Sequence, residues 1–211
     1  QRTSSAASDV YKRQEIEGSM RLRESISTLY QNQTIENIVV THGAIGANAL
    51  VHEAMVSEGD HVISICPTYQ QHYSIPESYG AEVEILWLKP ENNFLPDLIE
   101  LKSMLRSNTK LIVLNNPNNP TGALMMDEYL NNFIDVIAPS GAYVLCDEVY
   151  RGTNQEGTGF APAMADIYDK GISVSSMSKV FSLAGIRLGW IAGPREVLES
   201  VMIRRDYNDQ I

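Results

Sequence analysis

The sequence predicts an α/β fold: a mainly parallel (mixed) central sheet that is flanked by helices. Short runs rich in β-branched residues alternate with segments of helical periodicity, and several of these runs are apolar on both faces. Such strands are typical of parallel sheets covered by helices, because both of their faces are buried. The runs that we expect to form strands are residues 37–40, 61–66, 81–88, 111–114, 142–146, 172–176 and 188–192.

The first fourteen residues differ in composition and periodicity from the rest of the chain. These residues, 1–14, are polar and small and have no period, so we expect a disordered or non-native leader. The following segment places Leu22, Ile26 and Leu29 at helical spacing behind Ser19. This pattern predicts a surface helix over residues 18–30 with Ser19 as its N-cap.

Two more segments complete the expected elements. Residues 47–56 have helical spacing between the first two expected strands. Residues 196–211 begin a long helix that stops without a cap, so we expect that the chain is cut there. Because no linker or repeat divides the sequence, we expect one domain over residues 15–211.

Composition and charge exclude several classes of partner. The 211 residues include 26 Asp or Glu against 16 Lys or Arg, a net charge of −10. This balance argues against nucleic acid as a partner, since phosphate backbones are bound by clustered Lys and Arg. No apolar run approaches the roughly 18 to 20 residues of a membrane span, and the N-terminus has no signal-peptide core. We therefore expect no membrane partner either.

The cysteines and histidines indicate the compartment and argue against a metal site. Cys66 and Cys146 both follow apolar runs, which is typical of reduced, buried thiols and predicts a cytoplasmic protein. The four histidines do not pair at ligand spacing with cysteines or carboxylates, so we expect no bound metal.

Ligands of such sheets bind at the carboxyl ends of the strands, so polar residues there are candidate site residues. The strongest candidates follow the run 172–176, where Ser176, Ser178 and Lys179 stand together and Arg187 lies eight residues beyond the lysine. This pattern suits an amine that forms a Schiff base near a bound phosphate. The alternative for an isolated lysine is a solvated surface position.

A carboxylate and an amide follow two other runs. Asp147 stands where a buried strand emerges, with Tyr150 three residues on. Such a carboxylate can pair with a pyridinium nitrogen and keep it protonated, although it can also cap the following turn. In residues 114–122, two Asn-Pro steps force a rigid turn that fixes the amide of Asn119 at the same sheet edge.

Two weaker signals follow the first and second runs. Small residues let the backbone N–H groups of Gly43, Ala44 and Ile45 converge at a helix N-terminus, which favours a phosphate. This segment matches neither the dinucleotide fingerprint nor the P-loop. Tyr69 is placed to stack on a flat cofactor ring, or else to pack on the core.

These segments, in this order and spacing, resemble the large domain of the fold-type I, class I/II aminotransferases, which are pyridoxal 5'-phosphate (PLP) enzymes. The resemblance runs from about Glu15 to the end and rests on THGAIGAN, PTYQQHY, NNPNNPTG, CDEVYR and SSMSKVFSLAGIRLGW. The combination of NPTG, D-x-x-Y and S-x-S-K with an arginine eight residues later is specific, whereas each piece alone is not.

The resemblance implies a role for each candidate. Lys179 would form the Schiff base and shuttle the substrate Cα proton, and Asp147 would keep the pyridine nitrogen protonated. Tyr150 and Asn119 would hydrogen-bond the phenolic oxygen, and Tyr69 would stack on the ring. The groups implied to hold the phosphate are Ser176, Ser178, Arg187 and the backbone at Gly43, Ala44 and Ile45.

The implied activity is transfer of an amino group between an amino acid and a 2-oxo acid by a homodimer. The family also has an N-terminal lid and a C-terminal small domain with an arginine for the substrate carboxylate, and neither is present in this sequence. We therefore expect a fragment that binds the cofactor weakly and turns over poorly.

Three other functions compete with this one. A serine hydrolase is indicated by S-x-x-K at residues 176–179, but its S-D-N and K-T-G elements are missing. A non-enzymatic PLP-binding module would not require both Lys179 and Asp147. The same cofactor site also serves lyases and cyclases. The sequence around residues 41–51 resembles that of capreomycidine-synthase-like enzymes, which act on arginine derivatives.

Overall fold

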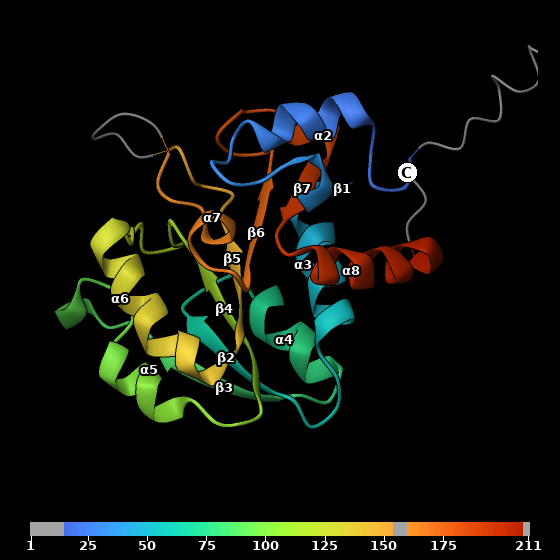
Figure 1. The fold of residues 1–211 in the computed structure, drawn as a ribbon. Helices are drawn as coiled ribbons and strands as arrows, with labels where there is room; N and C mark the ends of the chain where they lie inside the picture. Colours follow the sequence, from blue (N-terminus) through green and yellow to red (C-terminus); the bar gives the residue numbers. More distant parts are fainter. Residues whose placement is uncertain (1–14, 154–159, 209–211) are drawn as a thin grey trace, which may run out of the picture.

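The computed structural model describes residues 15–153 and 160–208, so the predicted leader lies outside the described residues. Its core is a seven-stranded sheet with helices on both faces (Figure 1). The strands are β1 (Ile38–His42), β2 (His61–Cys66), β3 (Glu82–Trp87), β4 (Thr109–Asn115), β5 (Tyr143–Asp147), β6 (Gly171–Ser176) and β7 (Leu188–Ala192). The helices are α2 (Met20–Ser27), α3 (Gly43–Met55), α4 (Gln71–Ser78), α5 (Leu98–Met104), α6 (Asp127–Ile137), α7 (Met164–Ile167) and α8 (Arg195–Asn208).

The sheet confirms the predicted mainly parallel, mixed topology. Its strand order is β1-β7-β6-β5-β4-β2-β3. Four neighbouring pairs, from β6 across to β3, are parallel, whereas β7 runs antiparallel to both β6 and β1. Each of the seven predicted runs contributes a strand, so the carboxyl ends of β2, β4, β5 and β6 meet along one edge of the sheet.

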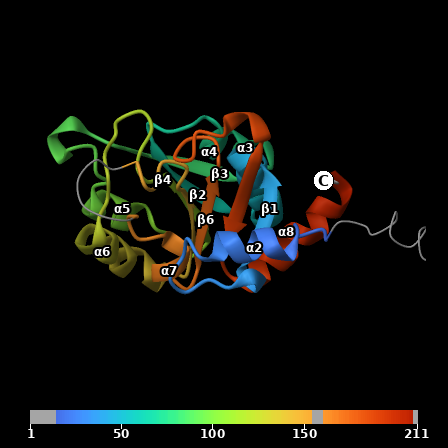
Figure 2. The same ribbon diagram turned by 90° about the horizontal axis from the view of Figure 1, so that it is seen from above.

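The two faces of the sheet are covered by different helices (Figures 1 and 2). Along β4, Leu111 and Val113 belong to a core cluster that includes residues of α3 and α8. Ile112 and Leu114 belong to a second cluster that includes residues of α5 and α6. Because successive side chains of a strand point to opposite faces, burial on both faces explains why these strands are continuous apolar runs.

The N-terminal helix is shorter than the sequence predicts. Helix α2 ends at Ser27, and the side chain of Ser19 forms no capping hydrogen bond. The chain then turns so that Tyr30 is buried, and Trp190 Nε1 donates to Tyr30 Oη at 2.7 Å. Residues 28–30 therefore leave the helix, and Tyr30 packs against a distant strand. Tertiary packing overrides the local helical periodicity here.

Helix α3 begins at Gly43, four residues before the predicted start. Gly43 has a φ of +66° and directly follows β1, so the sheet passes into the helix without an intervening loop. Gly43 therefore places the N-terminus of α3 at the strand end, where free backbone N–H groups can meet a ligand.

The two cysteines are buried and free, which confirms the prediction of buried thiols. Burial raises the pKa of both the Cys66 and the Cys146 thiol. Within the described part of the chain, no helix is both long and apolar enough to cross a bilayer.

Candidate active site

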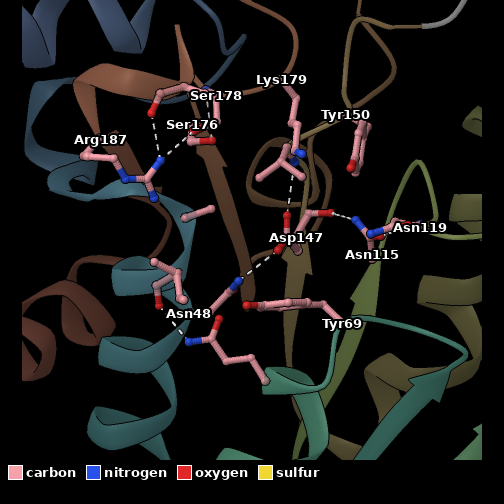
Figure 3. Close-up of a pocket in the computed structure, with 15 residues that line it drawn as sticks. Asn48, Tyr69, Asn115, Asn119, Asp147, Tyr150, Ser176, Ser178, Lys179 and Arg187 are labelled. Atoms are coloured by element: carbon pink, nitrogen blue, oxygen red, sulfur yellow. Dashed lines mark hydrogen bonds between the residues drawn. The ribbon is translucent and has the colours of Figure 1, made fainter. Parts of the chain in front are cut away.

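A cavity of about 340 Å³ lies at the carboxyl ends of the parallel strands (Figure 3). Its walls include every predicted site residue except Gly43, which stands next to Ala44 at the start of α3. The predicted residues therefore converge on one cavity, although they come from five separate segments of the sequence.

The Asp147 carboxylate is contacted from α3, from α4 and from its own turn. Asn48 Nδ2 donates to its Oδ2 at 2.8 Å, and His72 Nε2 lies 3.4 Å from the same oxygen. The backbone N–H of Val149 donates to Oδ1 at 3.1 Å. Asp147 thus caps its own turn and also faces the cavity, so the two interpretations of this residue are compatible.

Asn119 is fixed relative to Asp147 through a second asparagine. Asn115, the last residue of β4, donates from Nδ2 to the backbone oxygen of Asp147 at 2.7 Å. Its Oδ1 accepts the backbone N–H of Asn119 at 2.6 Å. The two strand ends are thereby cross-linked, which holds Asn119 at the cavity.

Lys179 enters the cavity three residues after β6. Its Nζ lies 5.7 Å from the ring centroid of Tyr150, and both residues line the cavity. Among the described residues, no carboxylate forms an ion pair with this amine. An amine without an acidic partner is available to act as a nucleophile or a base when it is uncharged.

The other end of the cavity carries a guanidinium beside a helix N-terminus. Arg187 Nη1 donates to Ser178 Oγ at 3.4 Å and to the backbone oxygen of Ala184 at 2.9 Å. The pairing of β1 with β7 brings this arginine next to Gly43, where a Cβ atom would lie 2.9 Å from Arg187 Nη2. A Cβ atom at Gly189 would lie 2.3 Å from the Gly43 carbonyl carbon. Only glycine permits this close approach, which places positive charge and free N–H groups together.

The Tyr69 ring lies across the cavity and is not packed into the core (Figure 3). It is 48% exposed, and its ring meets that of His72 edge to face, with centroids 6.4 Å apart. Next to it, Gln71 Nε2 donates to the backbone oxygen of Ile45 at 2.8 Å, which ties α4 to the start of α3.

Sequence reasoning missed Asn48, His72 and Asn115. Asn48 is a single polar residue within the small and apolar stretch GAIGANALV, and His72 follows Tyr69 by three residues. Asn115 belongs to the Asn-Pro string, but only Asn119 was singled out there. A lone polar residue inside an otherwise apolar helix is the signal that could have identified Asn48.

The segment after β5 is anchored behind the cavity by a buried ion pair. Arg151 Nε lies 3.1 Å from Glu148 Oε2, and these side chains are 7% and 1% exposed. The guanidinium also donates to the backbone oxygens of Leu29 and Ala161. The other Glu148 oxygen accepts from the backbone of Met164 at 2.7 Å. This network holds the turn that carries Asp147 and Tyr150.

We expect Arg151→Leu to lower the free energy of unfolding by about 3–5 kcal/mol, because it leaves a buried carboxylate unpaired. Burial raises the pKa of Glu148 to about 7, and Arg151 opposes this rise. Without Arg151, the folded-state pKa of Glu148 is higher still. Folded wild type and variant both keep Glu148 protonated at pH 5, so the pH-dependent part of the loss appears only as the pH rises through about 7. Urea unfolding should therefore show a larger loss at pH 8 than at pH 5.

Arg195→Ala is the matched control for this prediction. Arg195 forms an ion pair with Glu199 in which both side chains are at least 66% exposed. Exposed pairs of this kind contribute little, so we expect a change of at most about 0.5 kcal/mol. Equal stability of Arg151→Leu and Arg195→Ala would contradict the anchoring role.

Comparison with known proteins identifies the family. The profile described as "Aminotransferase class I and II" matches residues 2–206. The chain belongs to this family. A PLP-dependent aminotransferase from Streptococcus suis has the same fold, with a TM-score of 0.87 and 46% identity over 92% of this chain and 51% of its own. Members of the class I/II aminotransferases depend on PLP.

Two curated relatives of this chain are named for different reactions. The aspartate aminotransferase of Pyrococcus horikoshii is 32% identical over 87% of this chain and 48% of its own length. The capreomycidine synthase of Streptomyces vinaceus is 30% identical over 90% of this chain and 49% of its own length. The chain therefore spans about half the length of the curated relatives that it matches.

Proposed function

We propose that residues 15–211 are the PLP-binding large domain of an aminotransferase that moves an amino group between an amino acid and a 2-oxo acid. One observation carries this proposal: the Lys179 amine and the Asp147 carboxylate face the same cavity, and Arg187 stands at its far end. Membership of the class I/II aminotransferase family supports it. The aspartate aminotransferase among the relatives supports the reaction type.

The residues at the cavity fit PLP. The dianionic phosphate requires donors and a guanidinium, which Arg187, Ser178 and the N-terminus of α3 can supply. The glycine at position 43 leaves room beside Arg187 that a Cβ atom would fill. The pyridine nitrogen requires a carboxylate, which Asp147 presents from the end of β5.

The chemistry divides among these residues as follows. PLP supplies an aldehyde that reacts with amines and a ring that accepts electrons. Lys179 Nζ is the amine that would hold the cofactor, and as a free amine it would take the proton from the substrate Cα. Asp147 would hold a proton at the ring nitrogen, and Tyr150 and Asn119 would donate hydrogen bonds to the ring oxygen. Tyr69 would cover one face of the ring and exclude water there.

The proposal is tested by adding PLP to the purified chain, reducing with borohydride and locating modified lysines by peptide mass spectrometry. We expect a single major adduct on Lys179. Modification spread over surface lysines such as Lys102 and Lys110, with none at Lys179, would reject the proposal.

We expect Arg187→Ala to weaken the affinity for PLP by about 1.5–3 kcal/mol, because it removes a charge-assisted contact to the phosphate. Fluorescence titration should then give a Kd that is about 10- to 150-fold higher. Arg106→Ala is the control, since Arg106 bridges Glu82 and Glu84 at the far edge of the sheet. Unchanged affinity of Arg187→Ala would remove Arg187 from the phosphate site.

The alternative of a PLP-dependent lyase or cyclase is not favoured. The aspartate aminotransferase is more similar to this chain than the capreomycidine synthase is. Incubation of the full-length enzyme with an arginine derivative would distinguish the two, because a cyclase yields a ring product without forming a 2-oxo acid.

The proposal also covers the oligomeric state and the cellular location of the protein. We propose a homodimer, supported by large apolar side chains that are about half exposed at or near the cavity, namely Ile45, Tyr69 and Ile186. Light scattering after size-exclusion chromatography tests it. The two free, buried cysteines support a cytoplasmic location, where thiols stay reduced.

A further inference from the structure

Asn48 is a buried amide in which the nitrogen has a hydrogen-bond partner within the described part of the chain and the oxygen has none. It lies in α3, is 1% exposed, and donates from Nδ2 to Asp147 Oδ2 at 2.8 Å. Its Oδ1 is also buried and has no hydrogen-bond partner among the described residues. A buried acceptor without a partner destabilises a fold. The unsatisfied Oδ1 therefore offsets part of the stability that the Nδ2 hydrogen bond contributes.

The surroundings of Asn48 on α3 are apolar. Ala47, Leu50 and Val51 of the same helix are buried and belong to the core cluster beneath it. A side chain of similar size without polar atoms would remove the unsatisfied Oδ1, but it would also remove the hydrogen bond to Asp147 Oδ2. The feature that an apolar residue could not supply is the N–H group directed at Asp147.

The position of this N–H group decides how the carboxylate is oriented. The Oδ1 atom of Asp147 is held within its own turn by the Val149 backbone. The Oδ2 atom receives its short hydrogen bond from Asn48, on another element, with His72 Nε2 at 3.4 Å. A carboxylate tied at both oxygens from two directions cannot rotate freely, so its remaining lone pairs keep one orientation.

We propose that Asn48 is a positioning residue whose amide holds the Asp147 carboxylate in the orientation that meets the ring nitrogen of bound PLP. This inference rests on the proposed function. Asn48 also lines the cavity itself, so the residue that orients the carboxylate would stand beside a ligand bound there (Figure 3).

The test is Asn48→Leu, which keeps the approximate side-chain size and removes the donor. We expect the PLP-free variant to unfold at a slightly lower temperature than the wild type, because Asp147 Oδ2 loses its hydrogen bond from Asn48. We expect its Kd for PLP, measured by fluorescence, to rise about tenfold, as for loss of one charge-assisted contact. Leu50→Ala is the control on the same helix: it should lower the unfolding temperature and leave the Kd unchanged.

A second ligand separates positioning from a structural effect. The deaza analogue of PLP, in which C–H replaces the ring nitrogen, offers Asp147 nothing to bind. We expect wild type and Asn48→Leu to bind this analogue equally, so the preference for PLP over the analogue should fall about tenfold in the variant. Distortion of the whole cavity would weaken both ligands alike.

The binding measurements distinguish failure of the proposed function from failure of the proposed role of Asn48. If the wild-type chain binds no PLP, the proposed function fails and the role of Asn48 fails with it. If the wild type binds PLP and Asn48→Leu binds it as tightly, only the role of Asn48 is overturned. The same holds if the variant loses affinity for PLP and for the deaza analogue to an equal degree.

Discussion

Lys179→Ala is expected to abolish covalent attachment of PLP and to slow amino transfer by about 10⁴-fold or more in the full-length enzyme. The variant loses both the amine that bonds to the cofactor and the base that moves the Cα proton. After borohydride reduction, peptide mass spectrometry should show no cofactor on the peptide that contains position 179.

Lys170→Ala is the control for this loss. Lys170 donates to the backbone oxygen of Gly141 and lies over the ring of Tyr143, and it does not line the cavity. The adduct on Lys179 should persist in this variant. A reducible adduct that survives in Lys179→Ala at the same yield would show that another amine holds the cofactor.

Asp147→Asn is expected to slow amino transfer by about 10²–10³-fold, the range seen when one preorganised electrostatic contact is removed. The amide keeps the size of the side chain but has no negative charge to hold a proton at the ring nitrogen. The Lys179 adduct should still form, because the lysine and the phosphate-binding groups are unchanged. Single-turnover kinetics of the full-length enzyme measure the rate, and borohydride trapping measures the adduct.

The matched control is Asp166→Asn. Asp166 accepts the backbone N–H groups of Gln31 and Asn32 at 2.9 Å each, and it does not line the cavity. Its substitution should leave the single-turnover rate unchanged. An Asp147→Asn enzyme as fast as this control would show that the carboxylate does not act on the cofactor ring.

The strands could be predicted because their signal is local. Runs of β-branched and apolar residues identify β2 and β7 at their observed bounds, since burial on both faces is imposed residue by residue. The placement of β7 between β1 and β6 could not be predicted in the same way, because strand order depends on pairings between distant segments. The end of α2 could not be predicted for a related reason, because Tyr30 accepts a hydrogen bond from Trp190, which is distant in the sequence.

The site residues also divide into those that local sequence patterns predict and those that depend on long-range packing. Lys179, Asp147 and Asn119 lie at the ends of strands or within four residues of them, so a strand prediction is sufficient to place them at one sheet edge. Asn48 and His72 reach Asp147 from α3 and α4. Their contribution depends on how these helices rotate and pack on the sheet, which the sequence pattern does not specify.

The antiparallel insertion of β7 between β1 and β6 makes one end of the cavity depend on a long-range strand pairing. Asp147 and Asn115 lie on neighbouring parallel strands and can meet as soon as β4 and β5 pair. Gly43 can meet Arg187 only after β7 has paired with β1, and these strands stand near opposite ends of the described chain. Closure over so long a separation is entropically demanding and slow. A phosphate site built from Arg187 and the start of α3 would therefore be complete only in chains whose first strand has found its distant neighbour.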